Sequence, residues 1–282
     1  MYNFPIGVIT DSFRTDFKTA VEKAAAMGAQ GLQTYCTKGD FAPANMTPAK
    51  EKEILDIVKS NGLKFSAICG DLGMGFGKEQ DPENIETSKR IMELAKRLEC
   101  DIVTTHIGVV PTDKSNPRYG KMQEACFKLA EFADSLESHF AIETGPETSA
   151  VLKEFLDGLH SKGVGVNLDP ANLVMVTGDD PVQAVYNLKD YIVHTHAKDG
   201  VRLKPSNPEY IYHVVHPIPE EYANGGYYEE LPLGTGAVPF KQYLNALTDI
   251  GYKGFLTIER ECGETPEQDI RFAVDYLKNL MK

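Results

Sequence analysis

The chain has 282 residues, of which 42% are hydrophobic and 25% are charged, as is usual for a globular protein. Its formal net charge of −12, without any basic run, argues against a nucleic-acid partner because an acidic surface repels phosphate backbones. The sequence shows no apolar stretch near the roughly 18 residues of a membrane span and no signal-peptide pattern at its start. Five widely spaced cysteines outline no disulfide framework, so we expect a cytoplasmic protein without a membrane partner.

Strand-like and helix-like segments alternate from one end of the chain to the other. The predicted strands cover residues 5–10, 31–36, 64–69, 101–107, 139–143, 164–169, 191–197 and 254–259. Amphipathic helical patterns lie between and after them, for example at 47–60, 84–98, 118–136 and 266–281. In the second of these patterns, apolar residues recur at three- and four-residue steps, which is typical of a helix with one buried stripe.

Glycine and short polar residues indicate where the helices begin and end. Four glycines just before strands are predicted helix ends: Gly28, Gly62, Gly163 and Gly251. Thr15, Thr47 and Asp180 are predicted N-terminal caps, since their side chains accept backbone N–H groups.

About eight βα units predict the α/β architecture of a single (β/α)8 TIM barrel, formed by residues 1–282 as one domain. The alternative, an open doubly wound sheet, would place a Gly-rich phosphate turn after the first strand, and residues 10–14 do not form such a turn. A segment at about 199–238, rich in Pro, Gly and Tyr, interrupts the alternation after the seventh strand. We interpret it as a lid or substrate loop on the active-site face, the alternative being a passive insertion.

Four predicted strands end in a potential metal ligand: Glu143, Asp169, His196 (with His194 on the same face) and Glu259. Because strand side chains alternate, each of these residues shares a face with small or polar neighbours and opposes the large apolar ones. We therefore expect the four to point toward the barrel axis and bind one divalent metal ion, Mn²⁺, Mg²⁺ or Co²⁺, with Zn²⁺ possible. The alternatives are acids on the surface and histidines with satisfied partners in the core.

The motifs around these residues resemble the sugar phosphate isomerase/epimerase branch of the xylose isomerase-like TIM barrels. They are Ile-Glu143-Thr-Gly, Asn167-Leu-Asp169-Pro-Ala-Asn, His194-Thr-His196-Ala-Lys-Asp, Leu-Thr-Ile-Glu259 and Leu233-Gly-Thr-Gly-Ala-Val-Pro-Phe. The resemblance covers nearly the whole chain. It implies that Glu143, Asp169, His196 and Glu259 are the metal ligands, and that Glu143 and Glu259 exchange a substrate proton through an enediolate.

Five further residues are candidate substrate contacts: His106, Asn172, His194, Lys198 and Arg202. His106 has the inward register and would bind a hydroxyl, with a structural role as the alternative. In the related ketose epimerases a substrate-contacting arginine stands where this chain has Arg202, although the residues before it differ. Lys198 would bind a phosphate or hydroxyl, or else pair with Asp199.

Several functions stay open at this stage. Aldose–ketose isomerisation, dehydration of a keto-polyol or elimination from a keto-glycoside would use the same scaffold and metal. The apurinic endonuclease branch is disfavoured, because Asn172 stands where that branch has a histidine and other expected histidines are absent. A non-catalytic sugar-binding barrel would not need all four ligands. We thus expect a ketose or sugar phosphate as substrate, and a homo-oligomer is a further possibility because barrels with such loops often pair.

Overall fold

The computed structural model describes residues 2–73, 75–79 and 81–282, and at its centre is a closed barrel of parallel strands. Around the barrel the strands follow the order β1-β10-β7-β6-β5-β4-β3-β2. Their bounds are β1 (Ile6–Ile9), β2 (Gly31–Tyr35), β3 (Lys64–Cys69), β4 (Ile102–Thr105), β5 (His139–Glu143), β6 (Val164–Leu168), β7 (Ile192–Ala197) and β10 (Leu256–Ile258). All eight predicted strands are present, so the predicted barrel is confirmed.

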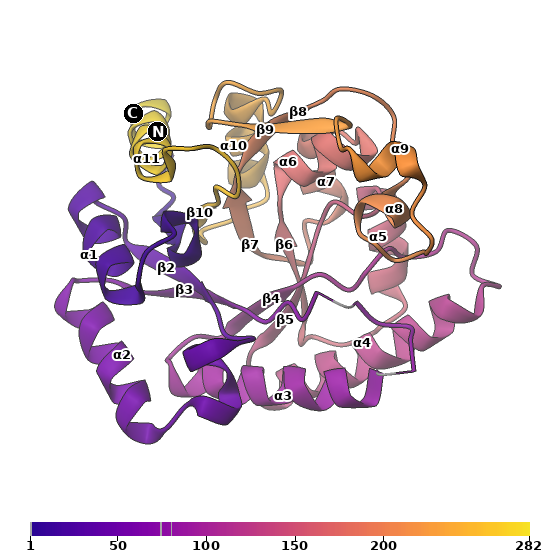
Figure 1. Ribbon diagram of the computed structural model, residues 1–282, viewed down its shortest axis with the longest axis horizontal. Coiled ribbons are helices and arrows are strands. Elements are labelled where there is room, and N and C mark those ends of the chain that lie inside the picture. The colour runs from indigo at the N-terminus through magenta and orange to yellow at the C-terminus, as the bar shows by residue number, and fades with distance from the viewer. Residues whose placement is uncertain (1, 74, 80) are drawn as a thin grey trace.

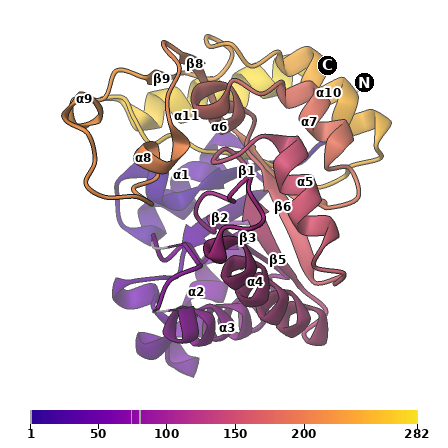
Figure 2. The same cartoon turned by 90° about the vertical axis from the view of Figure 1, so that its right-hand side faces the viewer.

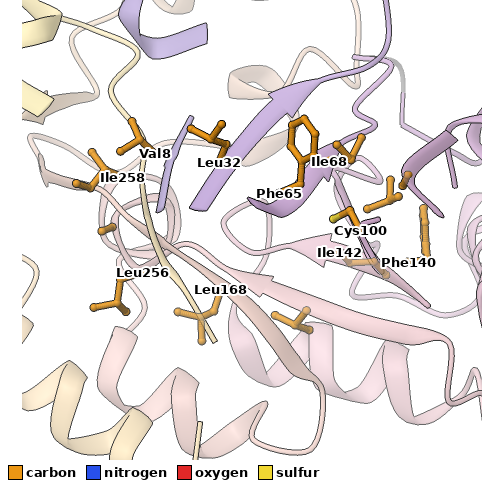
Figure 3. Packing of buried hydrophobic residues seen from close by; sticks show 14 of the residues in the cluster. Val8, Leu32, Phe65, Ile68, Cys100, Phe140, Ile142, Leu168, Leu256 and Ile258 are labelled. Carbon is orange, nitrogen blue, oxygen red and sulfur yellow. The ribbon is translucent and has the colours of Figure 1, made fainter. Parts of the chain in front are cut away.

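The alternation of side chains along the strands separates two environments. Large apolar residues such as Val8, Leu32, Phe140 and Leu256 are almost fully buried in one hydrophobic cluster with side chains of the surrounding helices (Figure 3). Several of their strand neighbours on the opposite face are small or polar, such as Gly7, Gln33, Ala141 and Thr257. A parallel barrel buries both faces of each strand, so the interior must be filled by side chains that satisfy one another.

Helices surround the barrel and bury its outer face (Figure 1). The longer ones are α1 (Phe17–Met27), α2 (Pro48–Ser60), α3 (Asp81–Arg97), α4 (Pro117–Ser135), α5 (Ser149–Asp157), α7 (Pro181–Asn187), α10 (Phe240–Asp249) and α11 (Pro266–Leu280). None of the described helices combines the length and apolar character that crossing a membrane would require.

Two of the predicted helix boundaries are wrong. The cap of α1 is Asp16 rather than Thr15, and its carboxylate accepts the Thr19 N–H at 3.0 Å. Gly163 does not cap α5, which ends at Asp157. A Cβ at Gly163 would lie 2.0 Å from the carbonyl oxygen of Ala130, so glycine is needed there because α4 passes close to the chain.

The segment at 199–238 is partly regular structure rather than one long loop. It contains β8 (Asp199–Arg202) and β9 (Tyr228–Leu231), which pair antiparallel, and the short helices α8 (Pro208–Ile211) and α9 (Glu220–Ala223). These elements lie together at one side of the barrel in Figures 1 and 2. β8, β9 and α8 pack on the π-helical turn Leu173–Thr177, and β8 also packs on α6 (Pro170–Asn172); both of these elements follow β6. The segment therefore adjoins the strand ends where the predicted ligands lie.

Candidate metal centre

The four predicted ligands meet at the C-terminal ends of β5, β6, β7 and β10. One potential ligand atom from each of Glu143, Asp169, His196 and Glu259 lies within 4.8 Å of every other. The Nδ1 atom of His196 is at their centre, 3.2 Å from an Asp169 oxygen, 3.3 Å from Glu259 and 3.6 Å from Glu143. Each of the four residues is at most 7% exposed, so the cluster lies inside the protein.

The charges of this cluster are those of a group that could hold a metal ion. Burial disfavours a charged imidazole, yet Glu259 and Glu143 raise the pKa of His196 well above its usual range. Burial also raises the pKa of Asp169, although His196 and Lys198 oppose that effect. Three buried carboxylates thus draw a proton onto the imidazole nitrogen that would otherwise bind a metal. Two ligand atoms on opposite sides of one ion, each about 2.1 Å from it, are about 4.2 Å apart. The observed distances between the four ligand atoms therefore fit a single ion after a slight contraction of the cluster.

The ligands rest on a layer of polar side chains deeper in the barrel. The Thr257 hydroxyl donates to His194 Nε2 at 2.8 Å, and the Nδ1–H of the same ring donates to Asn167 Oδ1 at 2.8 Å. The Asn167 amide then donates to Glu143 Oε2 at 3.1 Å. Strand register places Asn167 and Thr257 inward, but this connection to Glu143 was not predicted.

Gln33 was not predicted as part of the site at all. Its Oε1 atom lies 3.1 Å from His196 Nε2, and its amide donates to Thr104 at 3.3 Å. When the Nε2–H group of His196 donates to Gln33, the Nδ1 atom of the same ring points at the three carboxylates. The β2–β3 register shifts between Leu32 and Gln33, and such an irregularity can redirect a side chain. An irregularity of this kind leaves no periodic signal in sequence.

A cavity of about 240 Å³ opens beside the cluster. Residues from several loops line it: Tyr35, Cys69, Asp71, His106, Glu143, Asn172, Met175, Val176, Lys198, Ile211, Tyr212, Tyr228, Glu230, Glu259, Glu261 and Cys262. Ile211, Tyr212, Tyr228 and Glu230 belong to the segment at 199–238, so this segment covers part of the site. The contribution of Ile211, Tyr212 and Glu230 was not predicted, because the segment has no periodic pattern.

His106 and Asn172 lie where predicted, at the cavity next to Glu143. The Asn172 amide donates to Glu143 Oε1 at 3.1 Å. His106 Nδ1 lies 3.1 Å from Asp71, and its Nε2 lies 3.6 Å from Glu143 without a hydrogen-bond partner in the described residues. Although burial opposes the charged ring, Glu143 and Asp71 raise the pKa of His106 to about 9.

Lys198 also lines the cavity, but it pairs differently from the prediction. Its ammonium lies 3.0 Å from Glu259, contacts Glu261 and lies 3.9 Å from Glu230. Despite burial, Lys198 and His196 hold the pKa of Glu259 well below its usual range. Asp199, the alternative partner, instead accepts backbone N–H groups of its own segment.

Two predicted substrate contacts do not reach this cavity. His194 is 1% exposed and lies in the deeper layer, with both ring nitrogens in hydrogen bonds. Arg202 donates to the carbonyl of Thr177 at 3.0 Å and lines a separate cavity of about 460 Å³. The predicted inward direction of His194 is correct. Alternation along a strand does not, however, indicate how deep in the barrel an inward side chain lies.

The sequence matches the xylose isomerase-like TIM barrel family over residues 21–280. The chain belongs to this family. Two curated relatives match more locally. An uncharacterized protein of Methanocaldococcus jannaschii is 25% identical over 63% of this chain and 56% of its own length. Inosose dehydratase of Lacticaseibacillus casei is 27% identical over 50% of this chain and 45% of its own length. The chain thus spans about half the length of these relatives.

Solved structures with the same fold cover nearly the whole chain. A xylose isomerase domain protein from Planctomyces limnophilus has a TM-score of 0.78 and 24% identity, covering 99% of this chain and 97% of that one. D-Psicose 3-epimerase from Clostridium cellulolyticum H10 has a TM-score of 0.74 and 14% identity, covering 99% and 100%. The IOLI protein, whose structure has a bound zinc atom, has a TM-score of 0.76 and 15% identity, covering 99% and 98%. At these identities the likeness is one of fold.

Proposed function

We propose that the protein is a divalent-metal-dependent isomerase or epimerase of a sugar-like ketose. The observation that carries this proposal is the pair Glu143 and Glu259. They come from β5 and β10, two strands separated in the barrel by β6 and β7, and both line the same cavity. Two carboxylates that approach one small cavity from different strands can address the two faces of a carbon atom between them.

Glu143, Asp169, His196 and Glu259 would hold the metal, through the His196 nitrogen and one or more oxygens from each carboxylate. Mn²⁺, Mg²⁺ and Co²⁺ suit this donor set, and Zn²⁺ is compatible with it. When bound, the ion supplies Lewis-acid polarisation of a carbonyl oxygen, which makes the neighbouring C–H group more acidic.

The chain's own residues would move the proton. Glu259, kept ionised by Lys198, would remove a proton from the carbon beside the carbonyl. Glu143 would return a proton to the opposite face, with its two oxygens oriented by the amides of Asn167 and Asn172. In the reverse direction the two glutamates would exchange roles. If the proton were instead returned to the neighbouring carbon, from the side on which it was removed, the reaction would be an isomerisation.

Exchange of the substrate proton with solvent tests this proposal. Proton NMR of candidate ketoses in D2O, with manganese-loaded protein, should show deuterium entering the substrate carbon. Glu143→Gln and Glu259→Gln should each lower turnover by at least about 100-fold, as expected for loss of a general acid or base. Glu147→Gln is a matched control, because Glu147 lines the separate cavity. Near wild-type turnover in both active-site variants would overturn the proposal.

The second candidate is a dehydratase acting on a keto-polyol. Besides the inosose dehydratase relative, His106 favours it, because its Nε2 has no hydrogen-bond partner among the described residues and elimination needs a group that protonates the departing hydroxyl. The same NMR experiment separates the two, because dehydration removes a substrate oxygen as water whereas epimerisation retains every oxygen. If the protein is a dehydratase, His106→Asn should lower its activity more than the same substitution would if the protein is an epimerase.

A further inference from the structure

We propose that the site is built for an unphosphorylated substrate, because two of the chain's own carboxylates, those of Glu230 in the cavity wall and Asp199 directly after β7, occupy backbone anion-binding positions. TIM barrels frequently hold a phosphate in the loops after their seventh and eighth strands. In this barrel those loops follow β7 and β10, and they contain Asp199 and residues 260–263. This inference deepens the proposed function and uses it only to identify the cavity as a substrate site.

Glu230 takes the place of an anion in the loop after β10. Its Oε1 atom accepts the backbone N–H groups of Glu261 at 3.0 Å and Cys262 at 3.2 Å. The Arg260 guanidinium donates to the same oxygen at 2.6 Å, and the Lys198 ammonium lies 3.9 Å from Oε2. Two backbone amides, an arginine and a lysine form the kind of donor set that binds a phosphate group. Here a carboxylate that is 3% exposed already fills it.

Asp199 fills the Gly-rich loop that follows β9 in the same way. Its Oδ2 atom accepts the N–H groups of Gly234 and Gly236, each at 2.9 Å. Its Oδ1 atom accepts those of Gly200 at 2.8 Å and Val238 at 3.1 Å. A loop whose N–H groups converge on one point can cradle a phosphate, but these groups are all committed to an internal carboxylate.

The cations near the mouth are committed as well. Arg14 donates to the backbone carbonyls of residues 261–263, and Arg260 also pairs with Asp269 at 2.8 Å. Arg202 faces the separate cavity, and Lys204 lies over the ring of Tyr227 at 3.9 Å. Lys198 is shared among three carboxylates. Lys198 is thus unsuited to the phosphate-binding role that the sequence left open.

Charge on the described cavity wall leads to the same result. Five carboxylates line the cavity: Asp71, Glu143, Glu230, Glu259 and Glu261. Among the described lining residues, Lys198 is the only one with an ammonium or guanidinium group, and His106 adds an imidazole. Even with a divalent ion held by Glu143, Asp169 and Glu259, a phosphate ester would bring about two further negative charges into this enclosed volume beside Asp71, Glu230 and Glu261. A neutral polyol can instead donate hydroxyls to the carboxylates.

Removing the internal carboxylate provides a gain-of-binding test. Inorganic phosphate is titrated into the manganese-loaded wild-type protein, Glu230→Ala and Glu229→Ala, with binding measured by calorimetry. Glu230→Ala should bind phosphate at least tenfold more tightly than wild type, because Arg260 and the two amides become available. Glu229→Ala, which changes the exposed neighbour on β9, should behave as wild type. Equal phosphate affinity in a folded Glu230→Ala and in wild type would overturn the inference.

A binding competition in the wild-type protein covers the case in which Glu230→Ala fails to fold. D-Fructose and D-fructose 6-phosphate are titrated separately into the manganese-loaded protein, followed by each in the presence of inorganic phosphate. The free ketose should bind at least tenfold more tightly than its phosphate ester. Inorganic phosphate should change the affinity for neither sugar, because Glu230 already occupies the anion-binding position of the loop after β10. Tighter binding of the ester would overturn the inference whatever the activity. If the substrate shows no deuterium exchange while the ester and phosphate bind weakly, the result would count against the proposed function but not against this inference.

Discussion

Two histidines of β7 show how the barrel interior divides into two layers. His194 and His196 are two residues apart, both face inward, and each is 1% exposed. His194, in the deeper layer, has neutral partners in Asn167 and Thr257, and burial together with the charge of His196 holds its pKa well below its usual range. His196, in the upper layer, faces three carboxylates, which raise its pKa. The same residue type on the same face thus has opposite charge preferences.

The difference indicates that depth along the barrel, rather than residue type, separates the residues proposed to bind a ligand from those that hold them in position. Upper-layer residues lie at the strand ends, where a cavity gives access to a ligand. Deeper residues have no access and must satisfy each other's hydrogen bonds, which makes them suited to orienting the ligands above. Asn167 joins the layers, because it contacts His194 below and Glu143 above.

The largest expected effect follows from removing an upper-layer charge. Asp169→Asn keeps the shape of the side chain but replaces an ionised ligand with an amide, whose oxygen is a weaker donor. Changes to residues that only support metal ligands lower metal affinity by about 10- to 100-fold, so this change should exceed about 100-fold. Elemental analysis and competition with a chelator would measure the loss.

A matched control for Asp169→Asn is Asp179→Asn. Asp179 accepts the Ser149 N–H at 2.7 Å, away from the cavity. Its metal content should equal that of wild type. Full metal occupancy in Asp169→Asn would contradict the assignment of the upper layer as a metal site.

An intermediate effect is expected where the layers meet. Asn167→Ala removes the amide that orients Glu143 and leaves His194 Nδ1–H without its acceptor. Metal affinity should fall by about 10- to 100-fold, less than for Asp169→Asn, while the barrel still folds. Chelator competition measures the affinity and circular dichroism the fold. Unchanged affinity would mean that the deeper layer does not support the ligands.

Periodicity was sufficient to predict the barrel and the inward direction of Glu143, Asp169 and Glu259, because alternation along a strand determines which face a side chain occupies. It could not separate His194 from His196, since both satisfy the same alternation. Gln33 turns toward His196 next to an irregularity in strand pairing, which depends on tertiary contacts between β2 and β3. Local patterns also misplaced one cap by a single residue, because Thr15 and Asp16 are both good capping residues.

The pairing of Glu230 with the loop after β10 lay beyond sequence reasoning for a different reason. The two segments are about thirty residues apart, and their contact depends on how β8 and β9 fold back over the barrel. Arg202 illustrates the same limit, since its spacing from His196 was known but the direction of its side chain was not. Loops without periodicity are positioned by such contacts rather than by local propensity.

A smaller effect on metal binding is expected deep in the barrel. His194→Leu is similar in size but leaves Asn167 Oδ1 without its donor and removes the nitrogen acceptor of the Thr257 hydroxyl, which keeps only its contact with Ser66 Oγ at 3.2 Å. The free energy of unfolding of the metal-free protein should fall by about 1–3 kcal/mol at pH 7.5, measured with urea, because buried polar groups lose hydrogen bonds. Metal affinity of the folded variant should stay within about threefold of wild type. An affinity loss as large as that of Asn167→Ala would erase the distinction between the layers.

The smallest expected effect is a pH dependence of opposite sign in the two histidines of the metal-free protein. His194 has a folded pKa below its unfolded value, so the stability it contributes is present above about pH 6.5 and is lost as the pH falls. His196 has a raised folded pKa, so its contribution is present below about pH 6.5 and is lost as the pH rises through that pKa. The cost of His194→Leu should therefore be smaller at pH 5.5 than at pH 7.5, by at most about 1.4 kcal/mol per pH unit. Nitrogen-detected NMR of the two rings should find His194 neutral and His196 protonated at pH 6.5, and a shared titration would contradict the division into layers.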